Sequence, residues 1–289
     1  MKKAFKSIII ASLSLIPIHA FADDGQAQIA NEKAEKILQR LGPISNGRVD
    51  VITQDKETDL RMRAMKEVAN TIGAQEGYSY YINRFISTIE TNDQYMRHFD
   101  FSALMTAAGK DSKEMYVLPP VIEQVKNAEA VNDKGTQIKL SGDVYRILTN
   151  VRLVTAPPTW RDYLVPPVIS DTNKAPNDLL PKNNKEKEKW YGWVREGFIS
   201  GMEQGDREMK NRVSQLRTDY VGMIKYMELV EKGMVQQPVV AMQHINVEGD
   251  ESEMKVRSSI YEITQGANLV PNLNVWKSNQ HDDNRSSLR

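Results

Sequence analysis

Two long stretches of the chain carry apolar residues at helical spacing. The first runs from Met65 to Ile89 in steps of three, four or seven, and the second from Met209 to Val230 in alternating steps of four and three. Such spacing places the residues on one face of a helix. The second pattern predicts a long amphipathic helix, or several in succession, from Glu186 to a terminating glycine at Gly233.

Shorter elements are predicted around these helices. An apolar cluster predicts a second helix ending near Gly109, and it consists of Phe99, Phe101, Leu104 and Met105. Four short runs of alternating apolar and polar residues predict strands. These runs are residues 137–140, 144–147, 254–256 and 260–263. The polar tail at 277–289 is predicted to be disordered.

The middle of the chain is rich in proline. Because proline removes a backbone donor and clashes inside a helix, the six prolines between Thr155 and Asn184 predict a connector without regular helix at 156–185. It contains the run T-A-P-P-T-W-R-D-Y-L, whose candidate contact residues are Pro157, Pro158, Trp160, Arg161, Asp162 and Tyr163. Its aromatic rings suit either a core or an interface. We interpret the run as a rigid structural staple, with a docking segment as the alternative.

The regions before and after this connector resemble each other. Glu76-Gly77-Tyr78 matches Glu196-Gly197-Phe198 at a spacing of 120, and Arg97 matches Arg217. The matches continue at spacings of 118 and 116, and they pair Pro120-Val121 with Pro238-Val239, Ile138-Lys139-Leu140 with Met254-Lys255-Val256, and Val144-Tyr145-Arg146-Ile147 with Ile260-Tyr261-Glu262-Ile263. Chance matching of common apolar residues is the alternative. A true repeat predicts an α+β fold of two pseudo-repeated helix–helix–hairpin lobes, 58–155 and 186–276, joined by the connector.

The first 22 residues have the three parts of a secretory signal peptide. Basic residues come first, and they are Lys2, Lys3 and Lys6. An apolar run follows, and it is shorter than the roughly 20 residues that a membrane anchor needs. Ala20-Phe21-Ala22 then forms an A-x-A cleavage site before Asp23. We therefore expect an exported protein whose mature chain starts at Asp23 with a polar segment, 23–57.

Composition narrows the function classes. Cleavage removes three lysines from 38 basic residues against 38 acidic ones, which leaves a net charge of −3. No basic cluster points to a nucleic-acid surface, and no later run of eighteen apolar residues predicts a transmembrane helix. Because the chain has no cysteine, disulfides, thiolate metal sites and thiol catalysis are excluded, and a packed core must stabilise the fold.

Few residues stand in catalytic or metal-binding patterns. Ser252-Glu253-Met254-Lys255 matches S-x-x-K, but Ser170-Asp171-Thr172-Asn173 precedes it, no K-T-G follows, and Met254 lies in a predicted strand. The histidines beyond residue 22 are widely separated, and they are His98, His244 and His281. We therefore expect no enzyme activity, no metal and no other cofactor.

Three glycines recur every fourth residue at Gly197, Gly201 and Gly205. No G-x-G-x-x-G follows a strand, which argues against a dinucleotide loop. The acidic residues Glu196 and Glu203 argue against a membrane dimer motif. A stripe of small residues instead allows a second helix to approach closely, either from the same chain or from a partner.

Four elements together resemble a known family. They are T-A-P-P-T-W-R-D-Y-L at 155–164, Leu118-Pro119-Pro120-Val121, Asp178-Leu179-Leu180-Pro181-Lys182, and Asp219-Tyr220 through Gly222-Met223 to Pro238-Val239-Val240-Ala241. In order and spacing, from about Asp59 to Trp276, the chain resembles the DotC family, which includes the TraI lipoprotein of I-type conjugative plasmids.

This resemblance implies a non-enzymatic structural subunit of a type IVB secretion or conjugation system. Members of the family belong to the outer-membrane core complex, a ring-shaped assembly, beside DotD-like and DotH-like subunits. They help place the DotH-like subunit at the outer membrane, where protein effectors or a protein-bound DNA strand cross. The expected partners are therefore these subunits and other copies of the chain, without direct binding of nucleic acid.

One position departs from the family pattern. Members typically carry a lipobox cysteine directly after the signal sequence, whereas this chain carries Asp23. We therefore expect a periplasmic protein that its partners hold at the outer membrane. A second hypothesis is a free periplasmic binding or chaperone-like module, and a third is a peptidoglycan-active enzyme that uses Ser252.

Overall fold

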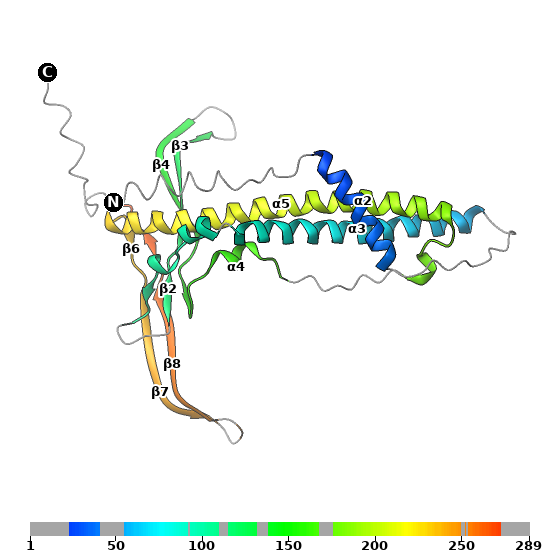
Figure 1. Ribbon diagram of the computed structural model, residues 1–289. Helices are drawn as coiled ribbons and strands as arrows, with labels where there is room; N and C mark the ends of the chain where they lie inside the picture. The colour runs from blue at the N-terminus through cyan, green and yellow to red at the C-terminus, as the bar shows by residue number, and fades with distance from the viewer. Residues whose placement is uncertain are drawn as a thin grey trace. The chain divides into compact units, whose positions relative to one another are not determined.

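The computed structural model describes most of the chain between residues 23 and 272 (Figure 1). The described ranges are 23–40, 55–91, 93–109, 115–131, 138–167, 176–249, 252 and 254–272. The predicted signal peptide and the predicted disordered tail lie outside them. Long helices and antiparallel strands confirm the α+β class. The chain divides into unit 1, residues 1–98 and 163–213, and unit 2, residues 99–162 and 214–289.

Unit 1 is built on two long helices that lie side by side. These are α3 (Asp55–Thr91) and the first part of α5 (Asn184–Glu231), and a shorter helix, α2 (Asp23–Arg40), packs on them. Arg61 contacts Glu186 near the start of both helices, and Tyr81 contacts Asp206 further along both. The contacting residues follow the same order along both helices, so α3 and α5 run parallel. The predicted polar segment at 23–57 thus includes a helix that its polarity concealed.

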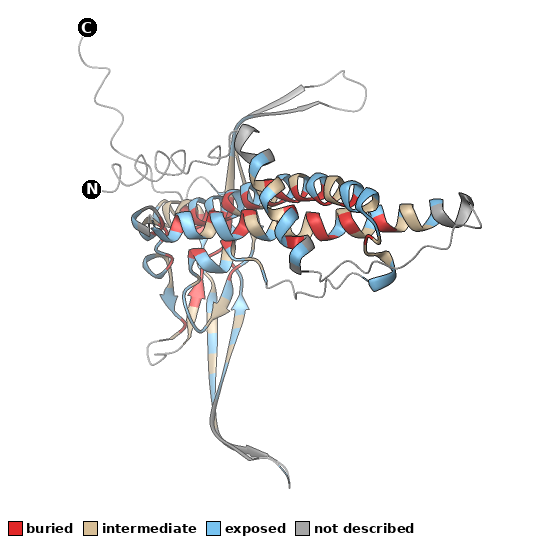
Figure 2. Cartoon of the chain, turned by 45° about the vertical axis from the view of Figure 1, so that its right-hand side comes forward, coloured by how far each residue is buried: buried red, intermediate tan, exposed pale blue. Residues whose placement is uncertain are grey.

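The predicted apolar faces of these helices form the core of unit 1. Buried residues from α2, α3 and α5 meet in one cluster, and they are Ala34, Ile37, Met65, Ala69, Ile72, Trp190 and Val194. Figure 2 shows buried positions along the facing sides of the long helices and exposed ones on their outer sides. The helical periodicity of both stretches is therefore confirmed, and α5 is a single uninterrupted helix.

Glycines bring the backbones of α3 and α5 into contact. A Cβ atom added at Gly77 would lie 2.0 Å from the carbonyl oxygen of Phe198, and one added at Gly201 would lie 2.0 Å from that of Ala74. Only glycine fits such an approach. The predicted role of the glycine stripe as a helix-packing surface is confirmed, and the neighbouring helix belongs to the same chain.

This helix contact has an internal symmetry. Gly73 approaches the carbonyl oxygen of Val194, and Gly197 approaches that of Asn70. Each residue of one contact lies 124 positions from its counterpart in the other, so equivalent positions of the two helices stand level. The spacing is one helical turn longer than the 120 of the sequence match. The duplication itself stays a prediction.

The described residues of unit 2 include the last turns of α5 and four antiparallel sheets. One sheet joins β1 (Thr106–Ala107), β2 (Tyr116–Leu118) and β5 (Arg152–Val154), and another joins β6 (Val235–Gln236) and β9 (Asn268–Leu269). The helix ends as predicted before Gly233, which has a φ of 70°. The Gly233 and Met234 N–H groups donate to the Val230 and Leu229 carbonyls, which is the Schellman pattern of a helix end.

The other two sheets are long two-stranded ribbons. Ribbon 1 pairs β3 (Val121–Val131) with β4 (Ile138–Thr149), and ribbon 2 pairs β7 (Val239–Gly249) with β8 (Met254–Gln265). The predicted strands at 137–140 and 144–147 are thus one strand, as are those at 254–256 and 260–263. Their partners β3 and β7 were not predicted as strands, because their polar residues interrupt the alternation.

Two further predictions are wrong. Residues 99–105 form no α-helix, because the Phe99 and Phe101 rings both pack edge-on against Tyr220, whereas two residues two positions apart point to opposite sides of an α-helix. The short 3-10 helix η1 (Asp93–His98) precedes this segment, and a second one, η2 (Ser102–Leu104), lies within it. The connector is also not free of helix, since it holds α4 (Trp160–Leu164) and η3 (Asn177–Leu179). All six prolines lie outside these two short helices, either before or after them, so that no proline interrupts a helical hydrogen bond.

Candidate interaction site

The T-A-P-P-T-W-R-D-Y-L run folds into the short helix α4 with a capped start. The Thr159 N–H and hydroxyl both donate to the Asp162 carboxylate, at 2.6 and 2.9 Å. The carboxylate thereby satisfies the N–H group of the residue that precedes the helix. Pro157 and Pro158 lead into the cap in irregular backbone. Asp162 therefore has a local structural role that its sequence pattern did not reveal.

The aromatic residues of the run differ in their surroundings. Trp160 is buried, and the exposed Arg161 guanidinium lies 4.2 Å from the centre of its ring. Tyr163 is half-buried, and its carbonyl accepts a hydrogen bond from Arg212 at 3.0 Å. Burial accounts for Trp160 as a structural residue, whereas a docking role of this run stays a prediction.

The two ribbons have the same register counted from a bulge at their bases. The pairing shifts between Val121 and Ile122 in ribbon 1 and between Val239 and Val240 in ribbon 2. We number the rungs of each ribbon outward from this bulge. The first four rungs of ribbon 1 are Ile122–Ile147, Glu123–Arg146, Gln124–Tyr145 and Val125–Val144. Those of ribbon 2 are Val240–Ile263, Ala241–Glu262, Met242–Tyr261 and Gln243–Ile260.

Rungs 1 and 3 form the inner face of each ribbon. In ribbon 1, Ile122, Ile147 and Tyr145 pack on the end of α5 around Tyr226 and Leu229. In ribbon 2, the equivalent residues pack on the three-stranded sheet around Val117 and Val151, and they are Val240, Ile263 and Tyr261. Alternating side chains point to opposite faces of a strand, so both ribbons use the same rungs to attach to unit 2.

Rungs 2 and 4 form the outer face, which is solvent-exposed in both ribbons. Val125 in rung 4 of ribbon 1 is 37% exposed, and Ile260 in rung 4 of ribbon 2 is 48% exposed. Figure 2 shows exposed and half-buried positions along the described part of both ribbons. Exposed apolar side chains are normal when they stand singly, and they mark a protein-binding surface where they form a continuous patch.

Charge separates the two outer faces. Arg146, in rung 2 of ribbon 1, keeps 64% of its side chain exposed while it pairs with Glu123 at 3.2 Å. The equivalent position in ribbon 2 is Glu262, which is exposed and has no ion-pair partner among the described residues. Rung 2 is therefore a neutral ion pair in ribbon 1, whereas in ribbon 2 it pairs the uncharged Ala241 with a single carboxylate.

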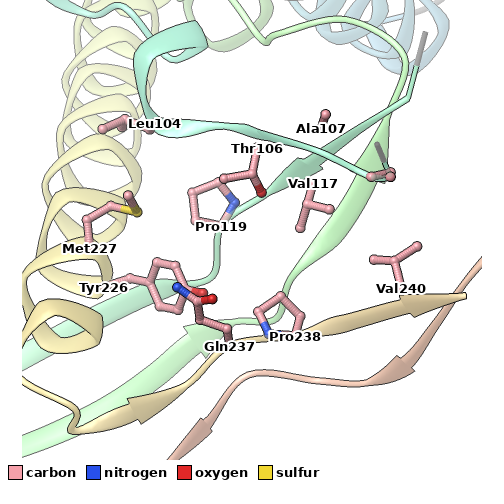
Figure 3. A pocket seen from close by; sticks show the side chains of 12 residues that line it. Leu104, Thr106, Ala107, Val117, Pro119, Tyr226, Met227, Gln237, Pro238 and Val240 are labelled. Carbon is pink, nitrogen blue, oxygen red and sulfur yellow. The ribbon is translucent and has the colours of Figure 1, made fainter. Parts of the chain in front are cut away.

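A pocket of about 450 Å³ lies in unit 2 between the β1–β2 edge and the last turns of α5 (Figure 3). Its walls carry no charged side chain, and they consist of Leu104, Thr106, Ala107, Ala108, Gly109, Val117, Pro119, Tyr226, Met227, Gln237, Pro238 and Val240. Burial raises the pKa of the Tyr226 phenol, so this hydroxyl stays neutral. The pocket suits an uncharged, largely apolar group.

The ionisable groups with shifted pKa values in unit 1 have structural partners. Burial and a hydrogen bond to Asp206 at 2.8 Å raise the pKa of Tyr81. Burial alone would raise the pKa of Glu186, but hydrogen bonds from Arg61, the Lys182 N–H and the Asn183 side chain outweigh it and lower this pKa. Arg61 also donates to the Asp178 and Leu180 carbonyls. These groups fasten the end of the connector and the start of α5 to α3.

The residues considered for metal binding and catalysis lie apart. Within the described ranges, no three His, Asp or Glu side chains converge as metal ligands. His98 ends η1, His244 in β7 lies 3.0 Å from the Ser259 hydroxyl, and His281 lies outside the described residues. Lys255 of the S-x-x-K match stands in strand β8.

No described helix is long and apolar enough to span a bilayer.

Comparison with known proteins places the chain in a family. Residues 59–278, well over half of the sequence, match the family model T4SS_TraI, described as type IV secretory system, conjugal DNA-protein transfer. The chain belongs to this type IV secretory system family. The match spans both long helices, both ribbons and the T-A-P-P-T-W-R-D-Y-L run. No curated protein matches the chain.

The sequence did not predict which strand residues form the exposed outer faces of the ribbons in this member of the type IV secretory system family. The runs at 144–147 and 260–263 were recognised as strands, but Arg146 and Glu262 were used only to align them. Their opposite charge at matched positions was a usable signal once the register was known. The register itself depends on β3 and β7, whose pairing only the tertiary structure shows.

Proposed function

We propose that the chain is a DotC-like structural subunit of the outer-membrane core complex of a type IVB secretion or conjugation system. In this role it helps place a DotH-like subunit at the outer membrane, beside DotD-like subunits and further copies of itself. Its task is to bind other proteins, and it performs no catalysis. The cargo of the machine is protein or DNA.

One observation carries this proposal: the family match extends over residues 59–278 and therefore over both units. The order of the motifs that resemble DotC supports the finer assignment. The exposed apolar rungs of the ribbons add a physical reason, because such surfaces suit binding to other proteins.

Deletion of the gene, followed by fractionation of the envelope, tests the proposal. The DotH-like protein is expected to leave the outer-membrane fraction, and transfer is expected to stop. The wild-type gene should restore both, and so should a Ser252→Ala variant, since this hydroxyl has no catalytic task. Normal transfer and an unchanged DotH-like distribution in the deletion strain would refute the proposal.

Export and retention are part of the same proposal. We propose cleavage before Asp23 and retention at the outer membrane through partners, since no cysteine follows the cleavage site. Mass spectrometry of the protein from the periplasm should find Asp23 as the first residue. In a strain that lacks the DotD-like and DotH-like subunits, the protein should move to the soluble periplasmic fraction.

A free periplasmic binding module is the second candidate, and the uncharged pocket of about 450 Å³ favours it. Ligand pockets of this size and character are common. Size-exclusion chromatography of an envelope extract from a strain with the whole system separates the two candidates. A subunit of the core complex elutes with a large assembly, whereas a binding module elutes as a small species.

A further inference from the structure

The uncharged pocket of unit 2 is open to solvent (Figure 3). Its walls come from strand β1, from the last turns of α5 and from the segment between β6 and β7. Thr106 and Ala107 of β1 and Gln237 of that segment are exposed. Apolar wall surface that faces water is stabilised when another apolar group covers it. With a volume of about 450 Å³, the pocket has room for a large side chain.

The chain that follows β9 starts close to this pocket. After β9, the Val270 N–H donates to the Met234 carbonyl at 2.9 Å. Met234 packs on the same hydrophobic cluster as Met227, which lines the pocket. From Met227 to Met234 the distance along a helix is roughly 10 Å, whereas the extended residues 271–276 span up to about 20 Å. Residue 276 can therefore reach the pocket of its own chain.

The residues beyond the described part of β9 and its neighbours match the pocket in chemistry. Residues 273–276 are Leu-Asn-Val-Trp and carry no charge, and Trp276 is the largest apolar residue after β9. The segment 110–114, which follows the pocket residue Gly109, is unsuited because four of its five residues are charged. The family match ends at residue 278, so it includes Trp276 and leaves out most of the polar tail.

We propose that the segment 273–276 folds back on unit 2 and that the Trp276 ring fills the pocket of the same chain. The ring covers Tyr226 and Met227, and Thr106 and Gln237 supply acceptors for its indole N–H. A short tether gives an effective concentration in the millimolar range, which favours this pocket over that of a second copy. The inference goes beyond the proposed function and does not depend on it.

A pocket filled in this way bears on the choice between the two candidate functions. The space lined by Tyr226 and Met227 is then part of the packing of unit 2, and a free ligand would have to displace the tryptophan. The pocket would therefore cease to favour a periplasmic binding module.

Cysteine labelling of the purified full chain tests the contact, because the chain has no native cysteine. Thr106→Cys places a thiol in the exposed pocket wall, and a maleimide is the probe. In the full chain, labelling should be about tenfold slower than in a chain ended after Asn272, since the reaction then requires release of the tryptophan. Trp276→Ser in the full chain should label as fast as the shortened chain.

Two controls separate the tryptophan from other causes of protection. A chain ended after Ser278 keeps Trp276 and lacks the polar tail, so its Thr106→Cys thiol should label slowly. Ser200→Cys, at an exposed position of α5, should label at one rate in every chain.

Three outcomes of the labelling would overturn the proposal. The first is an equal rate for Thr106→Cys in the full chain and in the chain ended after Asn272. The second is fast labelling in the chain ended after Ser278, since the polar tail would then be the cover. The third is protection that grows with protein concentration, because Trp276 would then enter the pocket of a second copy.

A charge in the pocket wall provides a second readout that leaves Trp276 in place. Ala107→Glu introduces a carboxylate at an exposed position of the wall, and Ala103→Glu is the matched control at an exposed position of η2 outside the pocket. Fluorine NMR of protein labelled with fluorotryptophan at its four tryptophans follows the ring, and Trp276→Phe assigns its signal.

The Trp276 signal should differ from that of free fluorotryptophan in the unchanged chain and in Ala103→Glu. In Ala107→Glu it should move to the position of the free amino acid, because burying a carboxylate beside the ring is unfavourable. A Trp276 signal that already has the free position in the unchanged chain would overturn the proposal, and so would a signal that Ala107→Glu leaves unmoved.

Discussion

Unit 1 and unit 2 are held together in opposite ways. In unit 1, glycines let the backbones of α3 and α5 touch, and side chains fill the cluster around Trp190. In unit 2, the ribbons attach through alternate rungs at their bases and expose the other face. Close backbone packing tolerates little change, whereas an exposed ribbon face can vary in sequence without loss of the fold. Unit 1 is therefore suited to rigidity, and the ribbons are suited to binding.

The largest effect is expected at the helix contact. Gly201→Val places a side chain where even a Cβ atom lies 2.0 Å from the Ala74 carbonyl oxygen, so the helices must separate. We expect a loss of about 5 kcal/mol in the free energy of unfolding, measured by urea denaturation. Gly192→Ala is the control, because its Cβ meets nothing within 4 Å, and it should stabilise α5 by up to about 1 kcal/mol. Similar losses in both variants would contradict the close-contact account.

A loss of the same order or slightly smaller is expected for Trp160→Ala in unit 2. Removing this buried ring should reduce the free energy of unfolding by about 3–5 kcal/mol. Arg161→Ala removes only the exposed cation above the ring and should cost about 0.5–1 kcal/mol. Thermal melting of both purified variants decides between staple and docking segment. An unchanged melting temperature for Trp160→Ala, together with loss of assembly, would favour docking.

An intermediate effect is expected at low pH in unit 1. The lowered pKa of Glu186 means that its contribution to stability is present above the ordinary glutamate pKa of about 4.3 and is lost as the pH falls through the lower folded value. Glu186→Gln should cost about 2 kcal/mol at pH 7 and flatten the acid limb of stability. Unfolding measured from pH 7 to pH 3 tests this. An acid limb identical to that of the wild type would show that other carboxylates dominate.

The smallest effect is expected in ribbon 1. Asn127 has a φ of 52°, a left-handed conformation that asparagine tolerates and β-branched residues do not. Asn127→Val should therefore cost about 1–2 kcal/mol, whereas Asn127→Gly should stay within about 0.5 kcal/mol. Hydrogen exchange should show faster opening of β3 in the valine variant with α3 unchanged. Equal acceleration in α3 would show that the ribbon is not an independent element.

Local patterns explain why the helices were predicted better than the ribbons. The steps of three and four from Met209 to Val230 are a property of neighbouring residues, and the end of α5 at Gly233 follows from the backbone freedom of glycine. The pairing of Val121 with Thr149 joins residues far apart in sequence. The adjacent polar residues Glu123 and Gln124 interrupt the alternation of apolar residues, so local sequence does not predict β3.

The candidate site was predictable only in part. Trp160 and its neighbours stood out by composition, but their burial and the cap formed by Asp162 depend on the packing around α4. Arg146 and Glu262 gave no local signal, since single charges on strands are common. Their matched positions become visible only when both ribbons have the same rung numbers.

The sequence by itself determined the α+β class, the two long amphipathic helices, the glycine surface for close helix packing and the resemblance to a secretion family. The helices and the glycine surface follow from the spacing of neighbouring residues and from the small size of glycine. The resemblance follows from the order of short motifs along the chain. Only the tertiary structure decided that α3 and α5 pair in parallel and that both ribbons share one register. Contacts between distant segments set these features, because burial selects which face of each strand turns inward.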